Sequence, residues 1–226
     1  MEKKYSGILK TRIVLKNQHI ARIDHENINF KFALTHAKTI KAKILSLLKK
    51  TDILVVSNYG KGSLTDDIIK FSIDSANKLR TPVIVDPRKM NSDYSIYARA
   101  SFVTPNLNEL RNIFPNIKNV NSDIEAACKI LNKNYNIKNI VVTRGDKGIT
   151  FFNKNLKFHS SSAAKEVYDV SGAGDTVVAT LSACLLLNIN IKKAIKLSNL
   201  CAGYVISLKG TQPITLTLFK SFLQIL

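Results

Sequence analysis

The sequence predicts an α/β fold in which a mainly parallel central sheet is flanked by helices. Short β-branched runs alternate with longer segments of helical periodicity along most of the chain, which is typical of strands joined by helical crossovers. The 226 residues are 45% hydrophobic and include only 9 Gly and 5 Pro, so there are too many core-forming residues for a disordered chain. We therefore expect one globular domain over residues 1–226.

The first fifty residues differ from the rest. Residues 12–15 and 20–24 are alternating or β-rich and surround Lys16 to His19, which predicts an exposed hairpin, a partial β lid near the N-terminus. Residues 34–48 have the pattern of a basic amphipathic helix.

Strands and helices then alternate. The expected strands are residues 52–57, 82–86, 101–104 and 139–143, and the expected helices between them are 64–79 and 106–114. Ser122 and Glu125 have capping-box spacing, which predicts a further helix running toward Leu131.

The last third is mainly helical. Residues 148–152 and 156–159 are expected to form an antiparallel pair joined by Asn153 to Asn155. Helices are expected at 172–187, at 191–208 and from Thr215 onward, with breaks at residues 188–190 and 209–211.

Composition argues against several classes of protein. The longest run of low polarity, Val177 to Leu187, is shorter than the ~20 apolar residues of a membrane span. Residues 1–6 lack the apolar core of a secretory signal. The three cysteines are far apart and lie in helix-like segments, so neither a disulfide framework nor a zinc site is expected. We expect a cytoplasmic protein without a membrane partner.

The net charge of +18 has two interpretations. Clustered Lys and Arg would indicate a nucleic-acid surface. Here 27 Lys and only 7 Arg are spread along the chain together with 21 Asn, a composition that A+T-rich codons produce. We therefore favour incidental basicity over nucleic-acid binding, although a positive field would still attract anionic substrates.

A glycine turn runs directly into an apolar helix at Val167 to Thr176. Two glycines permit close backbone approach, and the amides of the first helical turn form a site for an anion. Asp175 lies among these amides, where it would repel a static pyrophosphate but could accept a proton from a hydroxyl that attacks a phosphoryl group. The alternative is an acidic residue that only complements the helix dipole.

Residues 169–176, Asp-Val-Ser-Gly-Ala-Gly-Asp-Thr, resemble the C-terminal signature of the ribokinase-like (carbohydrate kinase) family. The resemblance implies a ribokinase-like fold, with Asp175 as catalytic base. It also implies that Gly172, Ala173 and Gly174 form the anion hole.

Two more segments resemble motifs of this family in the same order along the chain. Residues 104–109 resemble its Asn-x-x-Glu motif near the nucleotide phosphates and magnesium, and residues 143–148 resemble its nucleotide-binding strand end. The nucleotide-binding residues implied in this way are Asn106, Leu107, Asn108, Glu109, Thr143, Arg144, Gly145, Asn199, Ala202 and Gly203. Glu109 would also hold Mg²⁺ through water. A helix cap at Asn106 and Glu109, and ordinary helix packing at Asn199 to Gly203, are the alternatives.

Within the family, residues 57–62, 85–88 and 94–97 look most like heptose-7-phosphate kinases of the ADP-heptose pathway, and residues 17–24 resemble their lid. The resemblance implies ATP- and Mg²⁺-dependent phosphorylation of the anomeric hydroxyl of D-glycero-D-manno-heptose 7-phosphate for lipopolysaccharide core synthesis. The implied contacts to this sugar phosphate are Arg22, Asp24, Lys61 and Asp169. An exposed ion pair between Arg22 and Asp24, and a solvent-exposed Lys61, are the alternatives.

The chain also departs from the family pattern. Family members begin with a strand and a Gly-Gly motif that bind the sugar, whereas this chain begins inside the lid. We expect a lid remnant at about residues 1–30 and a nucleotide-binding core at residues 31–226. A homodimer or a separate N-terminal half would then complete the enzyme. The alternatives are a fragment without independent activity and a non-catalytic nucleotide- or nucleic-acid-binding derivative.

Overall fold

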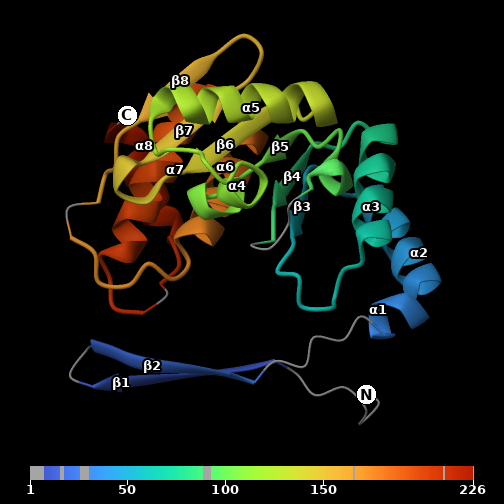
Figure 1. The fold of residues 1–226 in the computed structure, drawn as a ribbon, viewed down its shortest axis with the longest axis horizontal. Coiled ribbons are helices and arrows are strands. Elements are labelled where there is room, and N and C mark those ends of the chain that lie inside the picture. The colour runs from blue at the N-terminus through green and yellow to red at the C-terminus, as the bar shows by residue number, and fades with distance from the viewer. Residues whose placement is uncertain are drawn as a thin grey trace.

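The computed structural model describes residues 8–15, 18–25, 31–88, 93–164, 166–210 and 212–225. Its centre is a six-stranded sheet with the order β3-β4-β5-β6-β7-β8 (Figure 1). The strands are β3 (Leu54–Ser57), β4 (Val83–Asp86), β5 (Phe102–Val103), β6 (Asn139–Thr143), β7 (Ile149–Phe152) and β8 (Lys157–Ser160). Strands β3 to β6 are parallel, whereas β7 and β8 are antiparallel. The predicted α/β class and the antiparallel pair are confirmed.

Helices cover both faces of the sheet. The helices on one face are α2 (Ala37–Leu48), α3 (Asp66–Lys78), α4 (Leu107–Ile113) and α5 (Asn121–Tyr135). The helices on the other face are α6 (Ala173–Leu186), α7 (Ile191–Ile206) and α8 (Leu216–Ile225). Side chains of β4 alternate between the two cores: Val83 and Val85 pack against the first set, and Ile84 against the second. Burial on both sides explains why the strands are continuous apolar runs.

Two single-turn helices, η1 (Ser95–Tyr97) and η2 (Gly145–Lys147), lie in the connections that follow β4 and β6. A glycine ends the η2 turn. Gly148 has φ +85°, and a Cβ there would lie 2.1 Å from the carbonyl oxygen of Ser160. Only glycine fits where the β6–β7 connection crosses the end of β8.

An antiparallel hairpin precedes the core. It consists of β1 (Leu9–Leu15) and β2 (Gln18–His25), drawn in blue along the lower edge of Figure 1. The predicted hairpin is thus confirmed, with longer strands than expected, while Lys16 and Asn17 of its turn lie outside the described residues. Its apolar side chains are exposed, among them Leu9, Leu15 and Ile20.

The predicted helix at residues 34–48 is wrong in its extent. The structure has α1 (Lys31–Thr35), then a turn at His36, then α2. The His36 backbone leaves the helical region, with ψ near +13°, and its carbonyl accepts the first hydrogen bond of α2 from the Ile40 amide at 2.9 Å. An apolar pattern that continues across a break resembles one helix, so periodicity alone did not separate the two.

The capping box predicted at Ser122 and Glu125 is also wrong. The N-cap of α5 is Val120, with no side-chain cap, and the helix continues to Tyr135. Ser122 lies inside the first turn and donates to the Asp123 carboxylate at 3.2 Å, while Glu125 forms an ion pair with Lys157 at 2.7 Å. Among the described residues, no helix combines the length and the apolar character needed to cross a bilayer.

Candidate active site

Polar residues follow each of the parallel strands. Asn58 and Tyr59 follow β3, Asp86 ends β4, Asn106 follows β5 and Thr143 ends β6. Because parallel strands end at the same edge of a sheet, these residues gather along one edge, which is where open α/β sheets bind ligands. A bridge between Asn106 and Thr143 extends the β5–β6 pairing to this edge.

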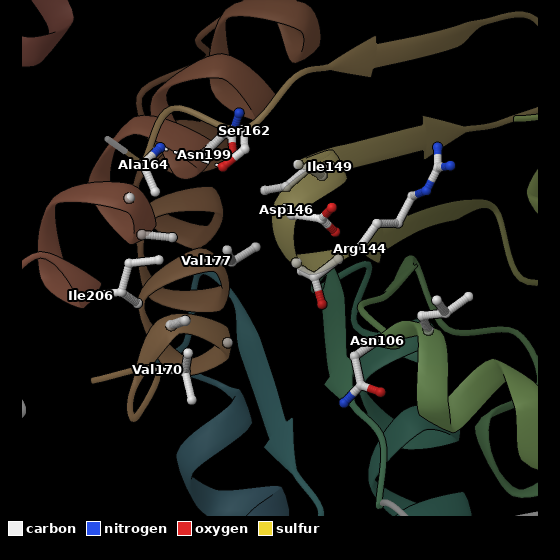
Figure 2. A pocket seen from close by; sticks show the side chains of 18 of the residues that line it. Asn106, Arg144, Asp146, Ile149, Ser162, Ala164, Val170, Val177, Asn199 and Ile206 are labelled. Carbon is white, nitrogen blue, oxygen red and sulfur yellow. Dashed lines mark hydrogen bonds between the residues drawn. The ribbon is translucent and has the colours of Figure 1, made fainter. Parts of the chain in front are cut away.

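A cavity of about 610 Å³ opens at this edge, between η2 and α4 on one side and α6 and α7 on the other. Figure 2 shows Asn106 and Arg144 on the first side and Val177 and Asn199 on the second. Every residue predicted to bind the nucleotide lines this cavity except Glu109, and Ala173 and Gly174 line it as well. Segments up to about a hundred residues apart in sequence therefore meet in one place.

The glycine turn is built as an uncapped helix start. Gly172 is the N-cap of α6 with φ +82°, a conformation that favours glycine, and no side chain caps the helix. The Gly172 carbonyl accepts from the Thr176 amide at 2.9 Å and from the Thr176 hydroxyl at 2.8 Å. Around Gly174 a Cβ would meet no atom within 4 Å. The Ala173 amide donates only a long hydrogen bond, 3.4 Å, to the Val170 carbonyl. A helix start without a side-chain cap is where backbone amides can bind an anion.

Asp175 is exposed on the first turn of α6, next to the cavity-lining Gly174. Its Oδ1 accepts a hydrogen bond from the Tyr59 hydroxyl at 2.8 Å. Asp86 lies close enough for its charge to interact with that of Asp175. Burial, and then the Asp175 charge, raise the pKa of Asp86 to about 6. A hydrogen bond with Thr104 lowers this pKa and so offsets part of the shift. The Asp86 carboxyl thus lies within electrostatic reach of Asp175.

Asn106 and Glu109 form the helix cap that was the alternative to a ligand site. The Asn106 side chain accepts from the Glu109 amide at 2.9 Å, and Glu109 Oε2 accepts from the Asn106 amide at 2.8 Å. Glu109 Oε1 accepts from Asn106 Nδ2 at 2.7 Å, and the residue is only 5% exposed. Within the part of the chain that the structure describes, no group of three His, Cys, Asp or Glu could hold a metal ion.

Arg144 contributes its backbone to the cavity rather than its charge. The residue is 4% exposed, and its guanidinium donates to Asn119, Asn121 and the Thr150 hydroxyl. Figure 2 shows the side chain extending away from Val177 and Asn199. Burial lowers the pKa of Arg144, partly offset by the Asp146 charge. Arg144 thereby fixes the segment before α5 to the end of β6.

Residues of α7 form the opposite wall. Asn199 Nδ2 donates to Ser160 Oγ at 3.0 Å and to the Ser161 carbonyl. A Cβ on Gly203 would lie 3.0 Å from the Ala164 backbone nitrogen, so glycine here lets the 161–164 loop approach the helix. Both residues therefore shape the cavity by holding this loop.

Several lining residues were missed by sequence reasoning. They are Asn119, Asp146, Gly148, Ile149, Ser162, Ala164, Val167, Val170, Val177 and Ile206. Val177 could have been found because it directly follows the signature, about one helical turn after Gly174. Ser162 and Ala164 belong to no predicted element, because their loop is held by tertiary contacts such as Asn199 Nδ2 with the Ser161 carbonyl.

The residues predicted to bind the sugar phosphate lie outside this cavity. Arg22 and Asp24 form an exposed ion pair at 2.9 Å. Such a pair was the alternative to a role of these two residues in binding the sugar phosphate. Lys61 lies between Gly60 and Gly62, both with positive φ. Asp169 Oδ1 accepts from the Ser171 amide at 2.9 Å and so shapes the start of the glycine turn.

The fold and the site together define a class of protein. Phosphofructokinase-2 from Escherichia coli in complex with substrates and products superposes with a TM-score of 0.76 at 16% identity, over 96% of this chain and 70% of that one. Ribokinase from Arabidopsis thaliana, complexed with ribose and ATP, gives a TM-score of 0.71 at 20% identity, over 80% of this chain and 58% of that one. At these identities the likeness establishes a ribokinase-like fold.

Sequence comparison gives the family. The pfkB family carbohydrate kinase pattern matches residues 11–217, and the chain belongs to this family. The bifunctional protein HldE of Campylobacter curvus is 37% identical over 214 residues, covering 93% of this chain and 44% of that protein. HldE of Actinobacillus succinogenes is 32% identical over 209 residues, covering 92% and 42%. The chain thus spans less than half the length of these curated relatives.

Proposed function

We propose that this chain is an ATP-dependent sugar kinase that phosphorylates the anomeric hydroxyl of D-glycero-D-manno-heptose 7-phosphate to the 1,7-bisphosphate. The observation that carries the proposal is the exposed Asp175 carboxyl beside the uncapped first turn of α6, at the edge of a cavity of about 610 Å³. The choice of sugar rests on the resemblance of residues 57–62 and 85–88 to heptose-7-phosphate kinases and on the 32–37% identity to HldE proteins.

The cavity fits a nucleotide. Its volume lies within the ~300–1,000 Å³ of small-molecule sites. Ile149, Val177 and Ile206 offer an apolar wall for a base, and the Ala173 and Gly174 amides lie where phosphate oxygens would bind. ATP would therefore place its base toward α7 and its terminal phosphate toward Asp175.

The residues also fit a magnesium ion that arrives with the nucleotide. Both Glu109 oxygens accept from Asn106, so Glu109 would hold Mg²⁺ through water rather than directly. When bound, such an ion neutralises phosphate charge.

Asp175 would accept the proton of the attacking hydroxyl. Phosphoryl transfer requires a base to orient the nucleophile and fixed donors to stabilise the transferred group. The Asp175 carboxyl supplies the first, and the backbone of Gly172, Ala173 and Gly174 the second. Because base and donors belong to one helix turn, their relative positions are fixed by the fold.

The residues proposed to bind the sugar phosphate come from other segments than those proposed to bind the nucleotide. We propose one kinase domain in which about residues 1–30 act as a lid and residues 31–226 as the nucleotide-binding core. Arg22, Asp24, Lys61 and Asp169 would contact the sugar phosphate, and the net charge of +18 would draw this anion inward.

The exposed apolar side chains of the hairpin support a homodimer, or a separate N-terminal half, as the working unit. The free, buried thiols of Cys128, Cys184 and Cys201 are consistent with a cytoplasmic protein.

A panel of acceptors tests the proposed substrate. The purified chain is incubated with ATP and Mg²⁺ and with heptose 7-phosphate, fructose 6-phosphate or ribose, and products are followed by ³¹P NMR. We expect a new anomeric phosphate with the heptose and no comparable turnover with the other two. Preferred use of another sugar would refute the substrate. Nucleotide binding without transfer to any acceptor would favour a non-catalytic nucleotide-binding derivative.

A further inference from the structure

The hydrogen bond from Tyr59 to Asp175 joins two segments 116 residues apart. Tyr59 lies in the turn after β3, and Asp175 lies on α6. We propose that Tyr59 is the positioning residue for Asp175: its hydroxyl fixes one carboxylate oxygen and leaves the other for the hydroxyl of the acceptor. This inference rests on the proposed function, because it assigns Asp175 the role of base.

The turn that carries Tyr59 is itself held from the core. Asn58 is 3% exposed; its Nδ2 donates to the Tyr97 hydroxyl at 2.8 Å, and its Oδ1 accepts from the Gly60 amide at 3.0 Å. Tyr97 is fully buried and also accepts from the Arg88 amide at 3.2 Å. Tyr59 is thus anchored on a turn whose neighbours are fixed on both sides, as a precise positioning contact requires.

The exposure of Asp175 explains why its side chain requires a positioning contact. It lies on the exposed first turn of α6, where solvent leaves several rotamers accessible. Within the described part of the chain, Tyr59 is its hydrogen-bond partner through Oδ1. A phenol has one proton to donate, so Oδ2 is left to accept from a substrate. The bond is charge-assisted and therefore stronger than one between neutral groups.

Electrostatics support the contact. A hydrogen bond with Ser57 lowers the pKa of Tyr59, but the hydrogen bond to Asp175, burial, and the charges of Asp175 and Asp86 together raise it above the ordinary value of 10.0. The phenol therefore stays protonated, and remains a donor, at neutral pH.

Kinetics of Tyr59→Phe provide the first test. Tyr59 is 59% exposed, so removing its hydroxyl should leave the unfolding midpoint unchanged. We expect kcat to fall about 10- to 100-fold, the loss of one hydrogen bond to a charged group, while KM for ATP and for the acceptor stays within about twofold. The matched control is Tyr135→Phe at the end of α5, which removes a tyrosine hydroxyl bonded to the Asp93 carboxylate. That variant should keep the wild-type kcat.

Titration of Tyr59 tests the contact without any turnover. In protein labelled with ¹³C at the tyrosine ring carbon bearing oxygen, NMR follows each phenol, and Tyr59→Phe assigns its resonance. Asp175→Asn should lower the pKa of Tyr59, whereas Asp74→Asn, an exposed pair with Arg99, should not change it.

The outcomes separate this inference from the proposed function. A Tyr59→Phe variant with kcat within twofold of an active wild type, or a Tyr59 pKa that is the same in Asp175→Asn, overturns the inference. A wild type that transfers no phosphate refutes the proposed function, and the titration still decides whether Tyr59 holds Asp175.

Discussion

Glu109, Arg144 and Asn199 each direct their hydrogen bonds to the protein itself. Glu109 closes the cap of α4, Arg144 binds Asn119 and Asn121, and Asn199 holds the 160–161 segment. The cavity wall is thus shaped by polar side chains, while in the proposed function backbone amides of α6 would meet the phosphates. At the scale of single residues, this separates positions that build the site from positions that would contact a ligand.

A substitution at Gly174 should weaken ATP binding without lowering the free energy of unfolding. A Cβ there meets no protein atom within 4 Å, so Gly174→Ala should leave the free energy of unfolding unchanged or raise it by up to ~1 kcal/mol, the helix preference of Ala over Gly. The new methyl group would occupy the space proposed for phosphate, so the Kd for ATP, measured by calorimetry, should rise about tenfold. Unchanged affinity would place the phosphates elsewhere.

Asp86 should make the free energy of unfolding depend on pH. Because its pKa is raised from 3.8 to about 6, the folded state binds a proton that the unfolded state releases, so its contribution to stability is present at low pH and lost as pH rises from about 4 to 6. The loss is at most about 3 kcal/mol, since one pKa unit corresponds to about 1.4 kcal/mol.

Urea unfolding of the nucleotide-free protein at several pH values measures this effect. The difference in unfolding free energy between wild type and Asp86→Asn should fall as pH rises through this range, whereas Asp74→Asn, an exposed control, should give a nearly flat difference. A flat difference for Asp86→Asn as well would show that its carboxyl is not perturbed.

At the scale of elements, the cap of α3 and the first turn of α5 can be compared directly. Thr65 caps α3 by accepting from the Ile68 amide at 3.2 Å, whereas Ser122 lies inside α5 and caps nothing. Thr65→Ala should cost about 1 kcal/mol of unfolding free energy, and Ser122→Ala less than about 0.5 kcal/mol. Equal losses in chemical denaturation would mean that the α5 cap had been placed wrongly.

Elements were predictable where burial on two faces imposes a pattern. Strand β6 begins and ends as expected because its buried residues Ile140, Val141 and Val142 form an unbroken apolar run. The break at His36 and the start of α5 were not predictable. Each depends on a backbone conformation that leaves no mark in the periodicity of the side chains.

At the scale of the whole molecule, the parallel sheet explains why separate motifs form one site. Asp86 and Thr143 end β4 and β6, Asn106 follows β5, and Gly174 belongs to α6, which packs on one face of the sheet. Motif resemblance indicated the residues proposed to bind the nucleotide, because most of them lie in three short motifs, at residues 104–109, 143–148 and 169–176. The contact of Tyr59 with Asp175 and the lining residues Ser162 and Ala164 were not predictable, since they come together only when distant segments pack.

Asp175→Asn tests the central claim most directly. The substitution keeps the size of an exposed side chain and removes its ability to take a proton. We expect kcat for heptose 7-phosphate to fall by a factor of ~10²–10⁴, the usual contribution of a general base, with the Kd for ATP unchanged by calorimetry. A variant that turns over at near the wild-type rate would contradict the role of Asp175 as base.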